Sequence, residues 1–162
     1  MGQTVKTNVI RLLEAEGIAH KVHSYPVDED FDAAEAALKI GVKPERVFKT
    51  LVASGGGTVF LVFCLPSVFE LDLRRAAEAS GCRRVELIHR DQLQSLTGYL
   101  RGGCSPFAMK KAFPTFVEET AQLFSTILVS AGLRGLQVEL SPVDLLRLGT
   151  RLLPRMELAS LA

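Results

Sequence analysis

Hydrophobic residues recur with helical spacing near the start of the chain, and polar residues fill the positions between them. In residues 5–13 the apolar side chains fall at i, i+4, i+7 and i+8, which places them on one helix face, and Gly17 follows as a stop signal. Four further helices are predicted from capping side chains and closing glycines. They cover residues 28–41 with Asp32 as N-cap and Gly41 after the last turn, residues 71–81 with Asp72 and Gly81, residues 91–98 with Asp91 and Gly98, and residues 141–149 with Ser141.

Two longer apolar stretches have strand character instead. Residues 46–54 and 58–65 are apolar on both faces, and the three glycines at 55–57 predict a hairpin with a flexible turn. The tail from residue 150 gives no clear prediction because Pro154 interrupts it, but its leucines are expected to cover the core. Shorter strands are predicted over residues 18–25, 84–88, 115–119, 125–131 and 136–140.

The order of these elements indicates the fold class. Helices and strands are intermixed, but most links between strands are too short for the crossovers that parallel strands need. We therefore expect an α+β fold with a mixed, largely antiparallel, β-barrel-like sheet and surrounding helices. At 162 residues the chain is expected to form a single domain, 1–162, that buries about two-thirds of its unfolded surface.

Composition and charge narrow the classes of function. The sequence is 48% apolar, and 19 Lys and Arg stand against 18 Asp and Glu, which argues against a polyanion binder held by net charge and leaves a local basic patch open. Three widely spaced cysteines outside any CxxC pattern predict neither disulfides nor a zinc site, and are typical of a reducing compartment. Without an apolar signal core or membrane-length segment, we expect a cytoplasmic protein with no membrane association, metal or cofactor.

Familiar catalytic signatures are missing from the sequence. It contains no GxSxG or HExxH motif, and no GK[ST] follows the triple glycine. In a regular strand His20 and His23 point to opposite faces, which makes them a poor metal pair, and His89 stands alone. Cys104 has no evident base beside it, so the case for a cysteine nucleophile is weak.

One lysine stands out against this background. Lys49 lies in the middle of the apolar strand predicted over residues 46–54, where neither face offers an obvious path to water. Burying an unpaired ammonium group is costly. The side chain therefore either snorkels at a strand end or faces a cavity that holds an anion or a carbonyl group, and the residues alone leave both alternatives open.

Two glycine-containing segments are also candidates for a site. Residues 97–111, TGYLRGGCSPFAMKK, form a long loop that could present backbone N–H groups to a carbonyl or phosphate, or could be a rigid surface turn. Residues 129–135, VSAGLRG, have glycines that a plain hairpin turn would explain without any function.

Taken together, the stretches VFKTLV, TGYLRGGCSPF and VSAGLRGLQVEL resemble, in order and spacing, the YbaK-type aminoacyl-tRNA deacylases, which are relatives of the editing domain inserted in bacterial prolyl-tRNA synthetases. The stretches LLEAEGIAHKVHSY and ELSPVDLL fit as well, so the resemblance covers nearly the whole chain. It implies a barrel-like α+β fold and hydrolytic clearance of mischarged aminoacyl-tRNA. In the closest branch cysteine is removed in trans from tRNA specific for proline, with prolyl-tRNA synthetase as a partner.

The resemblance also implies a set of site residues. Lys49 matches a lysine that such enzymes need for activity, while Cys104 replaces the usual aliphatic residue and Gln137 replaces a residue that is often acidic. The cations that could contact acceptor-stem phosphates, or form a solvated rim, are Arg101, Lys110, Lys111 and Arg134. The residues expected to bind the substrate are Tyr25, Phe31, Thr50, Gly102, Gly103, Cys104, Ser105 and Ser130.

A mechanism can be expected from the bond to be cut. An aminoacyl ester is already activated, so positioning and charge stabilisation would suffice. Lys49 would hold the terminal phosphate or ribose, backbone N–H groups around Gly102 and Gly103 would polarise the carbonyl, and the thiol of an esterified cysteine would attack. The alternatives are an alanyl- or seryl-tRNA hydrolase, in which water attacks, and a non-catalytic module that binds a tRNA end or small ligand. No DNA binding is expected.

Overall fold

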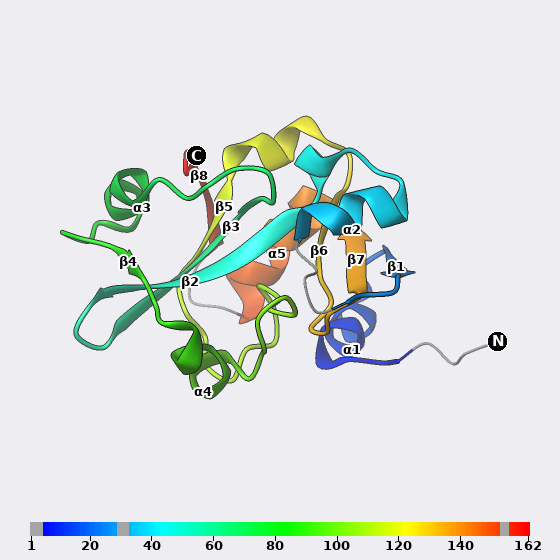
Figure 1. The fold of residues 1–162 in the computed structure, drawn as a ribbon, viewed down its shortest axis with the longest axis horizontal. Helices are drawn as coiled ribbons and strands as arrows, with labels where there is room; N and C mark the ends of the chain where they lie inside the picture. The colour runs from blue at the N-terminus through cyan, green and yellow to red at the C-terminus, as the bar shows by residue number, and fades with distance from the viewer. Residues whose placement is uncertain (1–4, 29–32, 153–155) are drawn as a thin grey trace.

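The computed structural model describes residues 5–28, 33–152 and 156–162 (Figure 1). Helices and strands are intermixed along the chain, as the sequence predicted, and short 3-10 turns lie among them. The elements are α1 (Asn8–Ala15), β1 (His20–Ser24), α2 (Ala33–Ile40), η1 (Pro44–Arg46), β2 (Phe48–Gly56), β3 (Val59–Pro66), α3 (Leu73–Ser80), β4 (Glu86–Leu87), η2 (Arg90–Gln92), α4 (Leu93–Thr97), β5 (Thr115–Glu118), η3 (Glu119–Leu123), β6 (Ile127–Ser130), β7 (Leu136–Leu140), α5 (Pro142–Leu152) and β8 (Met156–Ala159).

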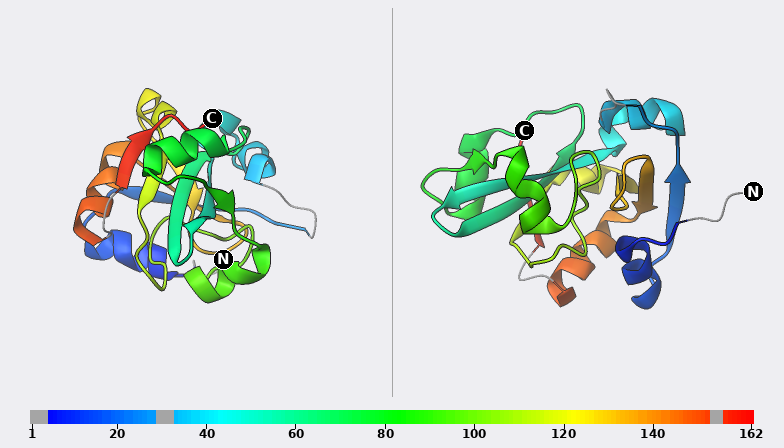
Figure 2. Two further views of the ribbon diagram at one scale, coloured as in Figure 1. Left: turned by 90° about the vertical axis from the view of Figure 1, so that its left-hand side faces the viewer. Right: turned by 60° about the horizontal axis from the view of Figure 1, so that its bottom comes forward.

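The strands form two sheets. One is antiparallel in the order β1-β7-β6, and the other runs β4-β2-β3-β5-β8 with parallel pairing only at β3–β5 and β5–β8 among the described residues. A parallel bridge between Val47 and Leu128 joins them. Figures 1 and 2 show the β2–β3 hairpin extending to one side of the molecule and β1 lying on the other. The mixed, largely antiparallel α+β architecture with surrounding helices is confirmed, and the barrel is not closed in the described part of the chain.

Capping residues explain most helix boundaries. The Asp72 carboxylate accepts hydrogen bonds from the first backbone N–H groups of α3, and Gly81 ends this helix with a φ of 70°. Ser141 Oγ accepts from the N–H group of Val143 at 3.3 Å at the start of α5. The prediction that Asp91 opens a helix was wrong, because a 3-10 turn begins one residue earlier and contains it. Asp32, the expected N-cap of α2, lies outside the described residues.

The C-terminal tail adds a strand that the sequence did not predict. β8 pairs with β5 in parallel, a contact between segments that lie far apart in the chain. Leu161 is fully buried, which confirms that leucines of the tail cover the core. The buried Glu118 carboxylate accepts hydrogen bonds from the N–H groups of Leu161 at 2.6 Å and Ala162 at 3.1 Å, so the tail is held by backbone polar groups as well as by packing.

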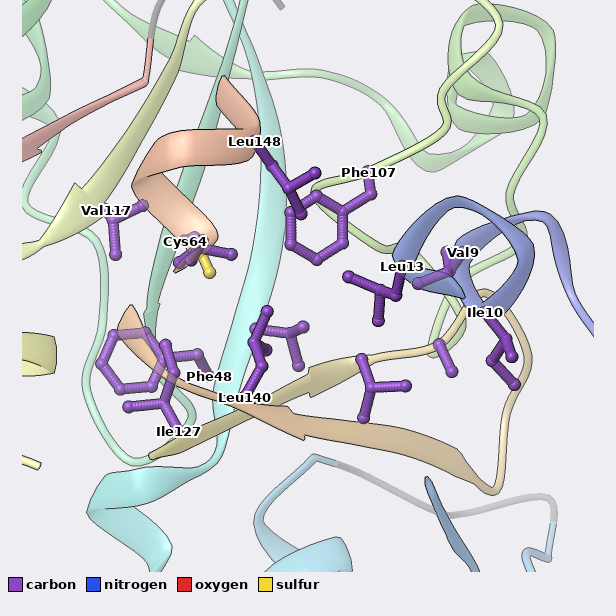
Figure 3. Close-up of a cluster of buried hydrophobic side chains, with 14 of the residues drawn as sticks. Val9, Ile10, Leu13, Phe48, Cys64, Phe107, Val117, Ile127, Leu140 and Leu148 are labelled. Atoms are coloured by element: carbon purple, nitrogen blue, oxygen red, sulfur yellow. The ribbon is translucent and has the colours of Figure 1, made fainter. Parts of the chain in front are cut away.

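Strands β6 and β7 of the β1-β7-β6 sheet are largely buried on both faces, whereas the edge strand β1 is half-buried to exposed. The inner face of the sheet packs against α1 and α5 in the main hydrophobic cluster, where Leu13 and Leu148 approach Phe107 and Leu140 (Figure 3). We call the opposite surface the α2 face, because α2 covers it through Ala36 and Ala37, which pack with Tyr25, Val47 and Leu128. The helices α1 and α2 therefore lie on opposite sides of β6 and β7, as Figure 1 shows. Polar side chains on the α2 face must find partners within the protein or in a cavity.

Candidate active site

A cavity of about 860 Å³ opens between β2, the glycine-rich loop and the β6–β7 turn. Its wall is built from segments that are distant in sequence, including the first residues of α2 and the segment from Leu87 to Leu93. The residues predicted to form a site that line this cavity are Lys49, Thr50, Arg101, Gly102, Cys104, Ser130 and Arg134. The fold therefore brings the lysine strand and both glycine-containing segments into one place.

Other predicted residues lie behind the wall or away from it. Tyr25 is buried behind Gln137, and Ser105 is fully buried beside Cys104. The exposed Lys110 and Lys111 are not among the residues that line the cavity. Phe31 lies outside the described residues.

Lys49 lies on the cavity wall and is partly buried. Its Nζ donates a hydrogen bond to the Ser67 carbonyl oxygen at 3.5 Å, just beyond the end of β3. Strand neighbours Phe48 and Val52 are nearly fully buried, so the ammonium group stands at an apolar strand that borders the cavity. Of the two alternatives that the sequence left open, this placement corresponds to the lysine that faces a cavity.

The glycine-rich loop packs directly on the β6–β7 turn. A Cβ atom on Gly103 would lie 3.2 Å from backbone atoms of both Leu133 and Arg134, and Gly102 has a φ of +85°. The N–H group of Gly103 donates to the Leu100 carbonyl oxygen at 2.9 Å. This internal bond removes Gly103 from the donors that were expected to polarise a bound carbonyl, and leaves the neighbouring N–H groups of the loop for that role.

The Cys104 thiol lines the cavity but is poorly suited to act as a nucleophile. Only 7% of the residue is exposed, and burial raises the pKa of the thiol to about 12. A thiol with this pKa stays protonated near neutral pH, and the thiolate is the nucleophilic form. Burial likewise raises the pKa of Cys64 in the core to about 12. The structure therefore agrees with the weak case for a cysteine nucleophile.

A pair of polar residues occupies the end of the α2 face beside the cavity. Ser130 on β6 and Gln137 on β7 are register partners, so their side chains share one face, and both line the cavity. Ser130 Oγ accepts from the Gly132 N–H group at 3.2 Å. Gln137 Nε2 donates to the Tyr25 hydroxyl at 3.1 Å, and burial raises the pKa of Tyr25.

One buried oxygen at this site, Gln137 Oε1 on β7, has no hydrogen-bond partner among the described residues, and Gln137 belongs to the cavity wall. The Thr50 hydroxyl on β2 instead interacts with the thiol of its register partner Cys64. An unsatisfied buried acceptor costs on the order of 1–3 kcal/mol. Most buried polar groups in proteins are paired, so an open acceptor on a cavity wall is a position that a donor of a ligand would satisfy. Thr120 Oγ1 on η3 is also unpartnered among the described residues, but Thr120 is not among those that line the cavity.

The charge of the described cavity lining is one-sided. Lys49, Arg90, Arg101 and Arg134 contribute to the wall, and no Asp or Glu appears among the described lining residues. Arg134 also donates to the Asp28 carbonyl oxygen at 2.7 Å, which ties this part of the wall to the segment that follows β1. A cleft lined by one sign of charge concentrates counter-ions, so this one attracts anions although the whole chain is nearly neutral.

Sequence reasoning missed Arg90 and Ser67, since nothing in their local sequence marks them. Both reach the cavity only because the segments after β3 and β4 return to β2. In the part of the chain that the structure describes, no group of three or more His, Cys, Asp or Glu side chains could hold a metal ion. No helix there is long and apolar enough to cross a membrane.

Comparison with known proteins assigns this arrangement to a family. Residues 28–148 match the model of the aminoacyl-tRNA editing domain, a span that includes nearly the whole cavity wall. The chain is 46% identical over 144 residues to EbsC of Enterococcus faecalis, which is named as a candidate Cys-tRNA(Pro)/Cys-tRNA(Cys) deacylase, and the match covers 88% of each protein.

Solved structures show the same fold at lower identity. A crystal structure described as a candidate trans-editing enzyme for prolyl-tRNA synthetase matches with a TM-score of 0.82 and 23% identity, covering 98% of both chains. A hypothetical protein matches with a TM-score of 0.83 and 21% identity, covering 95% of this chain and 99% of its own. The family model covers most of the chain, and the relative is 46% identical over 88% of it. This chain therefore belongs to the aminoacyl-tRNA editing domain family.

Proposed function

We propose that this protein is a trans-acting deacylase that removes cysteine from mischarged tRNA specific for proline by cleaving the aminoacyl ester. The observation that carries the proposal is a cavity with four cations and no carboxylate among its described lining residues. The cations suit the phosphates of a tRNA 3′ end, and the neutral wall suits the aminoacyl group. The 46% identity to a protein named for Cys-tRNA deacylation supports this choice of substrate.

The lack of a carboxylate or histidine in the described lining shapes the mechanism. We propose that the substrate's own thiol attacks the ester carbonyl carbon. The new carbon–sulfur bond replaces the carbon–oxygen bond to the ribose, the thiol proton passes to the departing ribose oxygen, and water later opens the cyclic thioester. The reaction is intramolecular, so the protein has to supply orientation and charge stabilisation rather than a strong base.

Each proposed role follows from a position in the cavity. Lys49 and the arginines Arg90, Arg101 and Arg134 hold the terminal phosphates and ribose. The N–H groups of Gly102 and Cys104 polarise the ester carbonyl, because the N–H group of Gly103 is bonded within the loop. Discrimination between tRNAs comes from a partner, for which we propose prolyl-tRNA synthetase. We place the activity in the cytoplasm, where free cysteines such as those of this chain stay reduced.

A deacylation panel tests the proposal. Purified wild-type protein, Lys49→Ala and Lys21→Ala are mixed with tRNA(Pro) charged with cysteine, alanine, serine or proline, and ester loss is followed. We expect the wild type to clear the cysteinyl ester fastest and Lys49→Ala to lose about 100-fold or more in kcat/KM. Lys21 is exposed on β1 away from the cavity, so Lys21→Ala serves as the matched charge control.

The other outcomes decide between the alternatives. If none of the esters is hydrolysed, the protein is a binding module. If the alanyl or seryl ester is hydrolysed faster than the cysteinyl ester, the protein is a sister hydrolase in which water attacks. Normal turnover by a folded Lys49→Ala variant would refute the role of the lysine. Thermal unfolding of each variant distinguishes a lost activity from a lost fold.

A further inference from the structure

The polar wall formed by Gln137 has features that the reaction proposed above does not use. Gln137 is 4% exposed, and its strand pairs with β1 on one side and β6 on the other, so its backbone is fixed. The Tyr25 hydroxyl accepts a hydrogen bond from Nε2 at 3.1 Å. The remaining atom, Oε1, is buried without a partner among the described residues, in a residue that lines the cavity.

The surroundings of Gln137 show that such a gap is not typical of this face. Two residues along β7 on the same side, the Glu139 carboxylate accepts three hydrogen bonds, from Thr126, His23 and Arg46. Among the described residues of this face, the open acceptor therefore lies where the face meets the cavity.

The chemistry of an aminoacyl ester offers few groups for this acceptor. Its strong donors are the α-amine and the ribose hydroxyls, while a thiol is a weak donor. Lys49, Arg90, Arg101 and Arg134 attract the phosphates and repel an ammonium group, so they place the nucleotide end and not the amine near themselves. The amine then requires an uncharged acceptor on the neutral part of the wall.

We propose that Gln137 Oε1 accepts a hydrogen bond from the α-amine of the esterified amino acid, with Tyr25 positioning the amide. This inference rests on the deacylase function proposed above. A neutral amide accepts from both the ammonium and the free amine. The amide can therefore bind the amine in its uncharged form, which the nearby cations of the cavity do not repel. Gln137 is thus a specificity-determining residue that distinguishes α-amino acyl groups from acyl groups without an amine.

The test compares two substrates on three proteins. The substrates are cysteinyl-tRNA(Pro) and the same tRNA carrying 3-mercaptopropionate, which keeps the thiol and lacks the amine. The proteins are wild type, Gln137→Met, which keeps the length but removes the acceptor, and Glu139→Gln, which perturbs the paired network on the same strand. We expect the wild type to prefer the amine-bearing substrate about tenfold in kcat/KM, mainly through KM, because one good hydrogen bond is at stake.

Gln137→Met should remove this preference, so that the two substrates have about equal kcat/KM. Glu139→Gln should keep the preference even if the protein is less stable. An unchanged preference in Gln137→Met, or no preference in the wild type, would overturn the inference while leaving the deacylase function in place. Cleavage of neither substrate by the wild type would instead overturn the deacylase function itself.

A second variant keeps the inference testable if Gln137→Met does not fold. Gln137→Glu preserves length and the acceptor but adds a charge that favours the ammonium form of the amine. An α-amine titrates near about pH 8. At pH values below this, the KM of Gln137→Glu for cysteinyl-tRNA should therefore be lower than that of the wild type, and the KM for the amine-free substrate should not change in this way. The same pH dependence of KM for both substrates would show that Gln137 does not contact the amine.

Discussion

The two ends of the α2 face of the β1-β7-β6 sheet differ in how their polar side chains are hydrogen-bonded. At one end the Glu139 carboxylate accepts from the Thr126 hydroxyl at 2.6 Å, from His23 at 2.8 Å and from Arg46 at 3.1 Å. At the other end, two residues away on the same strand, Gln137 Oε1 has no partner among the described residues. Both residues lie on one strand and face the same side, so the difference separates a polar group that stabilises the fold from one that is available to a ligand.

The paired end stabilises the connections of the sheet. Arg46 belongs to η1, His23 to β1 and Thr126 precedes β6, so one carboxylate on β7 ties four segments together. The hydrogen bond from Thr126 is the main reason that the pKa of Glu139 lies below its usual range, and the bond from His23 and the charge of Arg46 act in the same direction.

The largest effect expected from this comparison is the loss of the Glu139 carboxylate. Glu139→Ala leaves Arg46, His23 and Thr126 without their common acceptor, and should lower the free energy of unfolding by about 3 kcal/mol. Urea unfolding measures this change. Glu86→Ala is the matched control, because its ion pair with Arg84 is largely exposed and should cost at most about 0.5 kcal/mol. Equal losses in the two variants would contradict a structural role for the network.

Lowering the pH should remove part of the contribution that Glu139 makes to the free energy of unfolding. Because the folded pKa of Glu139 is lowered, its contribution is fully present above the unfolded value, ordinarily 4.5, and is lost as pH falls through the folded pKa. The stability difference between wild type and Glu139→Gln should therefore be constant from pH 7 to about pH 5 and shrink below that. Unfolding midpoints measured from pH 7 to pH 3 test this, and a difference that grows in acid would show the opposite sign.

A smaller effect is expected where the cavity depends on backbone contact. Gly103→Ala places a Cβ atom 3.2 Å from the backbone of Leu133 and Arg134, so the loop must shift by a few tenths of an ångström. We expect about a tenfold loss in kcat/KM for the cysteinyl ester, equivalent to about 1.4 kcal/mol of transition-state stabilisation. Leu100→Ala, which removes an exposed side chain from the same loop, is the control. Full activity in Gly103→Ala would separate the loop from catalysis.

Local signals in the sequence were sufficient for much of the fold. Asp72 begins a helix and Gly81 ends it, through hydrogen bonds and a positive φ that involve only their sequence neighbours. The β2–β3 hairpin likewise follows from its glycines and apolar strands. The parallel strand β8 was missed because its pairing with β5 is non-local and Pro154 obscures the pattern of the tail.

The site was predicted to the extent that its residues are chemically out of place. Lys49 is such a residue, and the structure places it on a cavity wall. Arg90 looks like any exposed arginine in the sequence, and only the return of η2 to the cavity distinguishes it. The Gln137 amide likewise has its hydrogen-bond partner Tyr25 112 residues away in the chain, so no local pattern could reveal the open acceptor.

The smallest effect is expected from Cys104, whose position in the cavity invites a catalytic interpretation. Burial raises the pKa of its thiol to about 12 from an ordinary value of 9.0, which lowers the thiolate fraction at neutral pH by about a thousandfold. Cys104→Ala should therefore change kcat/KM by no more than about threefold, through the shape of the pocket alone.

Alkylation of the native protein provides an independent measurement. Iodoacetamide at pH 8, followed by mass spectrometry, should modify the partly exposed Cys82 well before the buried Cys104. A thiol that served as nucleophile would require an accessible thiolate and would be alkylated first, with loss of activity in step. Protection of Cys104 together with activity in Cys104→Ala would exclude this thiol, and the choice between the substrate thiol and water would then rest on the deacylation panel. Cys104 would then belong with the packed groups of the wall, and the chemistry would depend on Lys49, the loop N–H groups and the open acceptor of Gln137.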